Sequence, residues 1–146
     1  MLRHVLLFLA FAAAFATPAC TSPARVTFIP EGGSYAGDEL KVALDESDPG
    51  RVAKVKTAEA SDVRQDALAN LRRNGEDAGD LADTLTAEFP VDVAAVPYRV
   101  EKGAYDGTPA WIVFEAWGEP GGQLSYRRVW VFSGDDLSVI ATHSGR

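Results

Sequence analysis

The sequence predicts an α+β domain in which a helical hairpin packs on an antiparallel β-meander, with short strands at its N-terminal end. Two segments between residues 61 and 89 carry apolar residues at helical spacing. From residue 94 onward, four runs of β-branched and aromatic residues alternate with short turns. Helices grouped together and strands grouped together favour segregated layers over alternating α/β units.

The N-terminal end of this domain predicts short strands. Pro30 and a glycine pair end the first run, and the turn sequence SDPG separates the second run from the third. The second run places Leu40, Val42 and Leu44 on one side, which is the period-two pattern of a half-buried strand. The expected strands are residues 25–29, 39–45 and 51–58.

The helical hairpin is predicted by its end signals as well as by its spacing. Ser61 can cap the first helix, and Asn74 with Gly75 can end it. The second helix has an apolar stripe and is stopped by Pro90. Because the joint is so short, we expect the two helices to run antiparallel and to cover one face of the sheet. The stripe consists of Ala78, Leu81, Ala82, Leu85 and Phe89.

The later strands are expected at residues 94–102, 110–117, 123–132 and 137–143. A slip of one residue reverses every side chain, so we chose the register that brings apolar residues together. It predicts a two-residue turn at 134–135, a five-residue loop at 118–122 and a three-residue loop with a bulge at 105–107. The face expected under the helices carries Val96, Tyr98, Val100, Ile112, Phe114, Ala116, Tyr126, Trp130, Phe132 and His143.

The opposite face holds the first candidate site. Trp111 and Trp117 lie there in this register, and Glu115 falls diagonally between Arg99 and Arg127 as a cross-strand charge ladder. Exposed tryptophan and arginine are typical anchors for a glycan, a peptide or a partner protein. The alternative is that the N-terminal strands fold across this face and bury both tryptophans.

The second candidate site lies on the covered face. Tyr126 and His143, with Arg128 nearby, could form an acid/base pair or an anion site between helices and sheet. Such a pocket indicates a small-ligand-binding protein or, with His143 in catalysis, a small hydrolase. Neither a nucleophile nor a third orienting group accompanies the pair. A histidine bonded to a tyrosine at the end of the sheet is therefore the alternative.

Motifs of catalysis and of cofactor binding are absent from the sequence. It contains no Gly-x-Ser-x-Gly elbow, no P-loop and no dinucleotide-binding glycine pattern. With one cysteine and two histidines, one of them near the N-terminus, a Cys/His metal site is excluded, and no EF-hand spacing occurs. The acidic run at 45–48 is typical of a solvated loop. We therefore expect no catalytic residues, no cofactor and no metal.

The N-terminus has the three parts of an export signal. Arg3 supplies positive charge, residues 5–16 form an apolar run of 12, and small residues follow. A run of this length is shorter than the ~20 residues that a bilayer-spanning helix needs, so we expect cleavage. The chain then divides into a signal peptide at 1–19, a tether at 20–24 and a single α+β domain at 25–146.

Residues 17–20, Thr-Pro-Ala-Cys, resemble a bacterial lipobox. Ala19 matches the small residue before the cysteine, whereas Thr17 stands where that family has an aliphatic residue. The resemblance implies lipid attachment at Cys20 and anchoring to the cell membrane or outer membrane, on the periplasmic or extracellular side. Cleavage at another small-residue site would instead release a secreted soluble protein. No domain family is recognised.

The charge of the chain bears on its partners. The formal net charge is −7. Among the charged residues, removal of 1–19 takes away only Arg3. The remaining chain has 21 acidic and 13 basic residues, and its net charge is −8. A negative field of this size opposes nucleic acids. The sequence thus predicts an exported cell-envelope domain with a non-catalytic binding or protein-interaction role. Its expected partner is an envelope protein, a peptide or a glycan.

Overall fold

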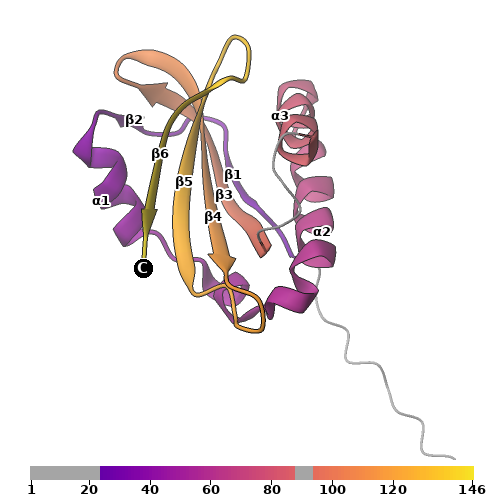
Figure 1. Ribbon diagram of the computed structural model, residues 1–146. Coiled ribbons are helices and arrows are strands. Elements are labelled where there is room, and N and C mark those ends of the chain that lie inside the picture. Colours follow the sequence, from indigo (N-terminus) through magenta and orange to yellow (C-terminus); the bar gives the residue numbers. More distant parts are fainter. Residues whose placement is uncertain (1–23, 88–93) are drawn as a thin grey trace, which may run out of the picture.

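The computed structural model describes residues 24–87 and 94–146, in which three α-helices lie against a six-stranded mixed sheet (Figure 1). Two of the helices form a hairpin, and the last four strands form an antiparallel meander. The predicted α+β class is therefore confirmed. The predicted signal peptide at 1–19, Cys20 and the predicted helix end at Phe89 and Pro90 lie outside the described residues.

The sheet is built around the meander. Its strands are β1 (Thr27–Ile29), β2 (Ser34–Tyr35), β3 (Ala94–Tyr105), β4 (Thr108–Gly118), β5 (Tyr126–Ser133) and β6 (Val139–Gly145). They pair in the order β1-β3-β4-β5-β6, and β2 also pairs with β3. β1 and β2 run parallel to β3, whereas the other pairs are antiparallel. Two short strands therefore make one edge of the sheet, and β6 makes the other.

Two of the helices within the described residues, α2 and α3, match the predicted helical hairpin. The bounds of the helices are as follows. They are α1 (Asp38–Glu46), α2 (Ala60–Arg72) and α3 (Glu76–Ala87), with 3-10 turns η1 (Gly50–Lys54) and η2 (Thr57–Glu59) between α1 and α2. Ser61 is not the cap of α2, because η2 runs directly into the helix and Glu59 takes the N-cap position. The predicted joint is confirmed, and Gly75 adopts a φ of 119° that only glycine adopts readily.

The expected strand at residues 39–45 is wrong, because this segment forms α1. Leu40 and Leu44 are buried, whereas Val42 between them is 54% exposed. A spacing of four places two leucines on one side of a helix as well as on one side of a strand, so the short pattern satisfied both periods. The expected strand at 51–58 is also wrong, since η1 and η2 occupy it.

The turn between β3 and β4 differs from the expected three-residue loop at 105–107. Asp106 and Gly107 form a two-residue turn with φ of 47° and 78°, which is typical of a type I′ hairpin. The irregularity in the pairing lies instead between Pro97 and Arg99. The prediction rejected this register because it turned Glu101 toward the core, yet Glu101 is fully buried.

The other two connections are longer than expected. Residues 119–125 join β4 to β5, and residues 134–138 join β5 to β6. Phe114 consequently pairs with Val129 and not with Tyr126. This odd-numbered shift places the even-numbered residues of β5 on the face opposite Phe114, together with Trp111 and Val113.

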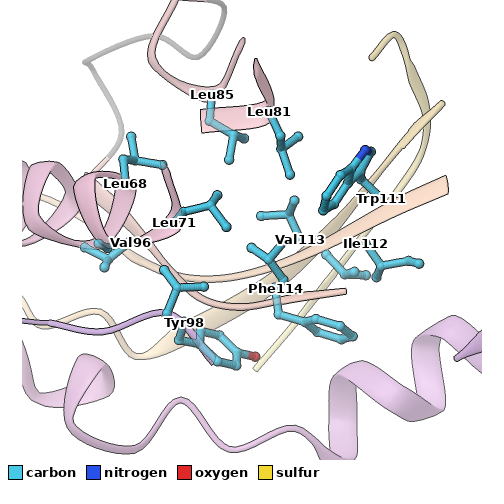
Figure 2. Packing of buried hydrophobic residues seen from close by; sticks show 14 of the residues in the cluster. Leu68, Leu71, Leu81, Leu85, Val96, Tyr98, Trp111, Ile112, Val113 and Phe114 are labelled. Carbon is cyan, nitrogen blue, oxygen red and sulfur yellow. The ribbon is translucent and has the colours of Figure 1, made fainter. Parts of the chain in front are cut away.

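Both faces of the sheet are covered by helices. α2 and α3 cover the face that carries Trp111 and Val113, which we call the hairpin face. α1 covers the face of Phe114, which we call the α1 face, and Ser47 at its end hydrogen-bonds Tyr98. Figure 2 shows the hairpin leucines above Trp111 and Val113, with Tyr98 and Phe114 on the opposite side. The predicted covered face is therefore right for Val100 of β3 and for Tyr126, Trp130 and Phe132 of β5, which lie under the hairpin. It is wrong for the predicted residues of β4, for Tyr98 and for His143, which lie on the α1 face.

The core accounts for the stability of both layers. Each fully buried leucine, isoleucine or phenylalanine contributes ~1.5–3 kcal/mol relative to an exposed one. The fully buried side chains include Leu40, Leu71, Leu81, Phe114 and Phe132. None of the helices within the described part of the chain is long and apolar enough to cross a membrane.

Candidate functional site

Trp111 does not lie on an exposed platform. Its side chain is 3% exposed beneath the hairpin, and it stacks on Phe28 with ring centroids 6.2 Å apart. The Lys102 ammonium lies 5.4 Å from its ring and also pairs with Asp77 of α3. The tryptophan is therefore part of the core: Phe28 of the N-terminal strand β1 packs on its ring, and α3 lies over it on the hairpin face.

The predicted ladder of Arg99, Glu115 and Arg127 is not formed. Arg99 pairs in register with Phe114 and Arg127 with Ala116, so both arginines face α1 while Glu115 faces the hairpin. Arg127 closes the C-terminal end of α1 by donating to the backbone carbonyls of residues 44, 45 and 47. Cationic groups at this position also stabilise the negative end of the helix dipole.

The three residues of the predicted pocket are also separated. Tyr126 and Arg128 lie on the hairpin face, opposite Trp117 and Glu115 of β4. His143 pairs with Val129, so its side chain lies on the α1 face. The acid/base pair between Tyr126 and His143 is therefore not formed.

A buried carboxylate organises the hairpin face. Glu115 has no exposed surface, and its Oε1 accepts a hydrogen bond from Arg64 of α2 at 2.7 Å. Its Oε2 accepts from Arg128 Nε at 2.9 Å and from the Trp130 indole at 3.1 Å. Burial alone would raise the pKa of Glu115, but the charges and hydrogen bonds of the two arginines outweigh burial and hold the pKa below its ordinary value. The carboxylate is therefore ionised at neutral pH.

Arg64 ties this cluster to the helices. Besides Glu115, it donates to the backbone carbonyls of Ala95 and Leu85, each at 3.0 Å. Its side chain is 18% exposed, so α2, α3, β3 and β4 meet at one largely desolvated guanidinium. Arg64 is not among the residues predicted from the sequence. Its signal was the spacing of four and seven to Leu68 and Leu71, which places a charge on the apolar side of a helix.

Aromatic and cationic side chains continue outward from this cluster. Trp117 and Tyr126 stack with ring centroids 4.8 Å apart. The guanidinium carbon of Arg128 lies 5.0 Å from the Trp130 ring, and that of Arg146 lies 5.9 Å from the Tyr126 ring. We call these five residues the aromatic–arginine strip.

The strip lies where the helical cover ends. α2 packs mainly on β3, at the far side of the hairpin face. All five strip residues retain solvent exposure, and the neighbouring Thr142 and Ser144 of β6 are exposed. Of the residues predicted for either candidate site, Trp117, Tyr126 and Arg128 are brought together here, while Trp130 and Arg146 are additions of the structure.

Two polar features set the chemistry of the strip. Arg64 and Arg128 against the single charge of Glu115 leave a formal charge of +1 at its base, in a chain whose net charge is −7. The buried Trp117 Nε1 has no hydrogen-bond partner among the described residues. The aromatic rings of the strip can therefore stack on a ring, and its arginines can attract an anion, whereas the buried Trp117 Nε1 lies out of reach of a ligand. No group of acidic, histidine or cysteine side chains in residues 24–87 and 94–146 is placed to hold a metal ion.

Comparison with protein-family models, with curated proteins and with solved structures gives no match for this chain.

Proposed function

We propose that this chain is an exported cell-envelope domain that binds its ligand without transforming it, and that the aromatic–arginine strip is the binding surface. The observation that carries the proposal is the row of partly exposed Trp117, Tyr126 and Trp130 interleaved with arginine on adjacent strands. Tryptophan, tyrosine and arginine are the residue types that most often carry binding energy.

The strip is held in place before any ligand arrives. Arg128 and Trp130 both donate to Oε2 of Glu115, so one buried carboxylate orients a guanidinium and an indole at the same time. Ordering a flexible side chain on binding costs about 0.5–1.5 kcal/mol. A surface whose rotamers are already fixed avoids much of that cost, which favours binding by a rigid sheet.

The chemistry of the strip favours an acidic glycan among the three partner classes. Flat aromatic rings can stack on the C–H faces of sugar rings, and a guanidinium forks onto a carboxylate through paired hydrogen bonds. Neither Nη of Arg128 donates to a described residue, so both are available for such a bond. The net charge of the chain, −7, opposes nucleic acid.

The binding proposal can be tested with a soluble oligosaccharide of hexuronic acid and a neutral glucan of equal length, titrated by calorimetry. We expect Trp117→Ala to weaken binding of the acidic oligosaccharide about tenfold or more, because truncation of an anchoring aromatic costs over ~1.4 kcal/mol. Arg146→Ala should weaken it less. Arg73→Ala is the matched control, since Arg73 is exposed at the end of α2, away from the strip. Equal binding of the neutral glucan, or unchanged binding by Trp117→Ala, would overturn the proposal.

The export part of the proposal rests on residues 1–20 and has a separate test. The intact mass of the protein from a membrane fraction should correspond to a chain that begins at Cys20 and carries lipid. An unmodified chain that begins at Thr17 or Arg25 would contradict lipid anchoring and favour a secreted protein. This result is independent of what the strip binds.

A further inference from the structure

The joint between α2 and α3 carries Asn74 followed by Gly75, and both residues are exposed. An asparagine side chain ends in an amide carbon, and the backbone nitrogen of the following residue can attack this carbon. Glycine has no Cβ, so little shields its amide nitrogen when it follows asparagine. This pair therefore favours a reaction between a side chain and the backbone.

The peptide group between these two residues is not held by the helices. The amides of Arg73 and Asn74 donate to backbone carbonyls of α2, whereas the Gly75 amide donates to none of the described residues. Gly75 itself adopts a φ of 119° outside both helices. Its nitrogen is therefore free to act as a nucleophile.

The Asn74 side chain can leave its present position at little cost. Its Nδ2 donates to the carbonyls of Asn70 and Leu71, each at 3.1 Å. These carbonyls also accept from backbone amides, that of Arg73 at 3.2 Å and that of Asn74 at 3.0 Å. Neither carbonyl loses its last partner when the side chain rotates toward Gly75, and water can take the place of the side-chain donor.

Asn70, the other asparagine of the chain, is in the opposite situation. It lies within α2, where the amide of the next residue is held in a helical hydrogen bond. That residue is Leu71, whose buried side chain crowds the amide. The Oδ1 atom of Asn70 also accepts from the Val26 amide at 3.2 Å. The chain thus holds one asparagine that is open to backbone attack and one that is protected from it.

We propose that Asn74 is a site of spontaneous deamidation and that its products loosen the helical hairpin. The Gly75 nitrogen loses its proton and attacks Cγ of Asn74, and the new C–N bond closes a five-membered succinimide. The Cγ–Nδ2 bond breaks, and the side-chain nitrogen takes up a proton and leaves as ammonia. Water then opens either carbonyl of the ring, which gives aspartate or isoaspartate at position 74. This site does not depend on the aromatic–arginine strip or its ligand.

Both products weaken the joint between the helices. A carboxylate has no N–H to donate, so both side-chain hydrogen bonds at the end of α2 are lost. Isoaspartate also carries the main chain through Cγ, which lengthens the joint by one methylene group. Leu71 and Ala78 are buried on either side of the joint. A longer joint therefore disturbs the packing of the hairpin on the sheet.

The test is incubation of the purified chain in mildly alkaline buffer, followed by digestion with trypsin and mass spectrometry. Cleavage after Arg72 and Arg73 places the two asparagines in different peptides. We expect the peptide with Asn74 to gain about 1 Da and to separate into aspartate and isoaspartate forms. The peptide with Asn70 should stay unchanged. Isomerisation of an aspartate elsewhere in the chain causes no mass change, so it is not mistaken for this reaction.

Asn74→Gln should abolish the mass gain, because the longer side chain would have to close a six-membered ring. Asn70→Gln is the matched control and should leave the gain at Asn74 intact. The chain unfolded in denaturant is the reference for the reactivity of the sequence itself. If Asn74 deamidates there but stays unchanged in the folded chain, the fold protects this residue and the proposal is overturned. A product that contains aspartate without isoaspartate would overturn the succinimide route.

The effect on the hairpin has its own measurement. Asn74→Asp should lower the melting temperature by about 2–8 °C, and the aged wild-type chain should melt lower still, because it also contains isoaspartate. The aged Asn74→Gln chain should keep its initial melting temperature. If neither Asn74→Asp nor ageing of the wild-type chain changes the melting temperature, deamidation does not loosen the hairpin and that part of the proposal is wrong.

Discussion

The two buried glutamates of this sheet place their carboxylates in the core, and each is stabilised there by a different set of partners. Glu115 on β4 and Glu101 on β3 both have no exposed surface, but their side chains lie on opposite faces. Glu115 accepts hydrogen bonds from two arginines and an indole that come from α2 and β5. Glu101 pairs with Arg99, a neighbour on its own strand, and is otherwise bonded to the segment before α1.

Apart from Arg99, the partners of Glu101 come from the short segment between β1 and α1. Its Oε2 accepts from the Gly33 amide and from the Tyr35 hydroxyl, each at 3.0 Å. A Cβ on Gly32 would come within 2.6 Å of the Glu101 side chain, so only glycine lets this turn approach so closely. Glu101 therefore anchors the β1–β2 connection, whereas Glu115 joins the helical hairpin to the sheet and fixes the candidate site.

The largest expected effect is that of Glu115→Gln. The amide removes the only counter-charge that Arg64 and Arg128 have among residues 24–87 and 94–146, and their side chains are just 18% and 16% exposed. Breaking a buried ion pair from one side costs about 3–5 kcal/mol, and we expect the lower end here because both arginines reach water. Chemical denaturation measures the loss in the free energy of unfolding.

Asp83→Asn is the matched control for this substitution. Asp83 pairs with Arg72 on the surface, where the two side chains are 72% and 40% exposed, and its loss should cost less than about 1 kcal/mol.

Acid titration gives a second readout of the role of Glu115. Because the folded-state pKa of Glu115 lies below its ordinary value, its contribution is complete above about pH 4.5 and is lost as the pH falls through the lowered pKa. An unchanged acid profile in Glu115→Gln would contradict this role of the carboxylate.

The contrast between the two glutamates also explains which parts of the fold could be predicted. The helical hairpin was predictable because its signals are local: the apolar stripe of α3, and the joint at Asn74 and Gly75. The strands of the meander were predictable from composition for the same reason, whereas the strands expected at 39–45 and 51–58 are helical. The register was not, because it depends on partners that are distant in the sequence.

The register of β3 was mispredicted because Glu101 was expected to be exposed, whereas it is buried. Alternation identifies faces only when one side of a sheet is apolar, and this sheet is buried on both sides. A buried charge then decides between registers, and whether it is tolerated depends on Gly33 and Tyr35, over 60 residues away. The membership of the candidate site was only partly predictable for the same reason. Trp117, Tyr126 and Arg128 were identified from the strands. Arg64 lies on a helix, and no strand pattern predicts its contact with Glu115.

Glu101→Gln should cost less than Glu115→Gln. Glutamine can still accept hydrogen bonds from Gly33 and Tyr35, and Arg99 is 33% exposed, so it recovers water more readily than Arg64 or Arg128. We expect a loss of about 1–3 kcal/mol in the free energy of unfolding, measured by chemical denaturation. A loss equal to or greater than that of Glu115→Gln would show that the number and source of charged partners do not set the order.

The smallest effect is expected at Tyr35, whose hydroxyl donates to Glu101. Tyr35→Phe removes one hydrogen bond and should cost about 1 kcal/mol. Burial, and then the charge of Glu101, raises the pKa of Tyr35 to about 12. Because the folded value exceeds the unfolded one, stability from this group is complete below about pH 10 and falls as the pH rises toward 12.

This titration separates the charge of Glu101 from the burial of its neighbour. Glu101→Gln removes the second cause of the raised Tyr35 pKa but leaves the first, so the pKa should fall only part of the way to its ordinary value. Ultraviolet absorbance of tyrosinate follows the transition, and Tyr35→Phe identifies it among the four tyrosines. If the Tyr35 transition stays where it is in Glu101→Gln, the carboxylate does not act on the hydroxyl through its charge, and burial alone raises this pKa.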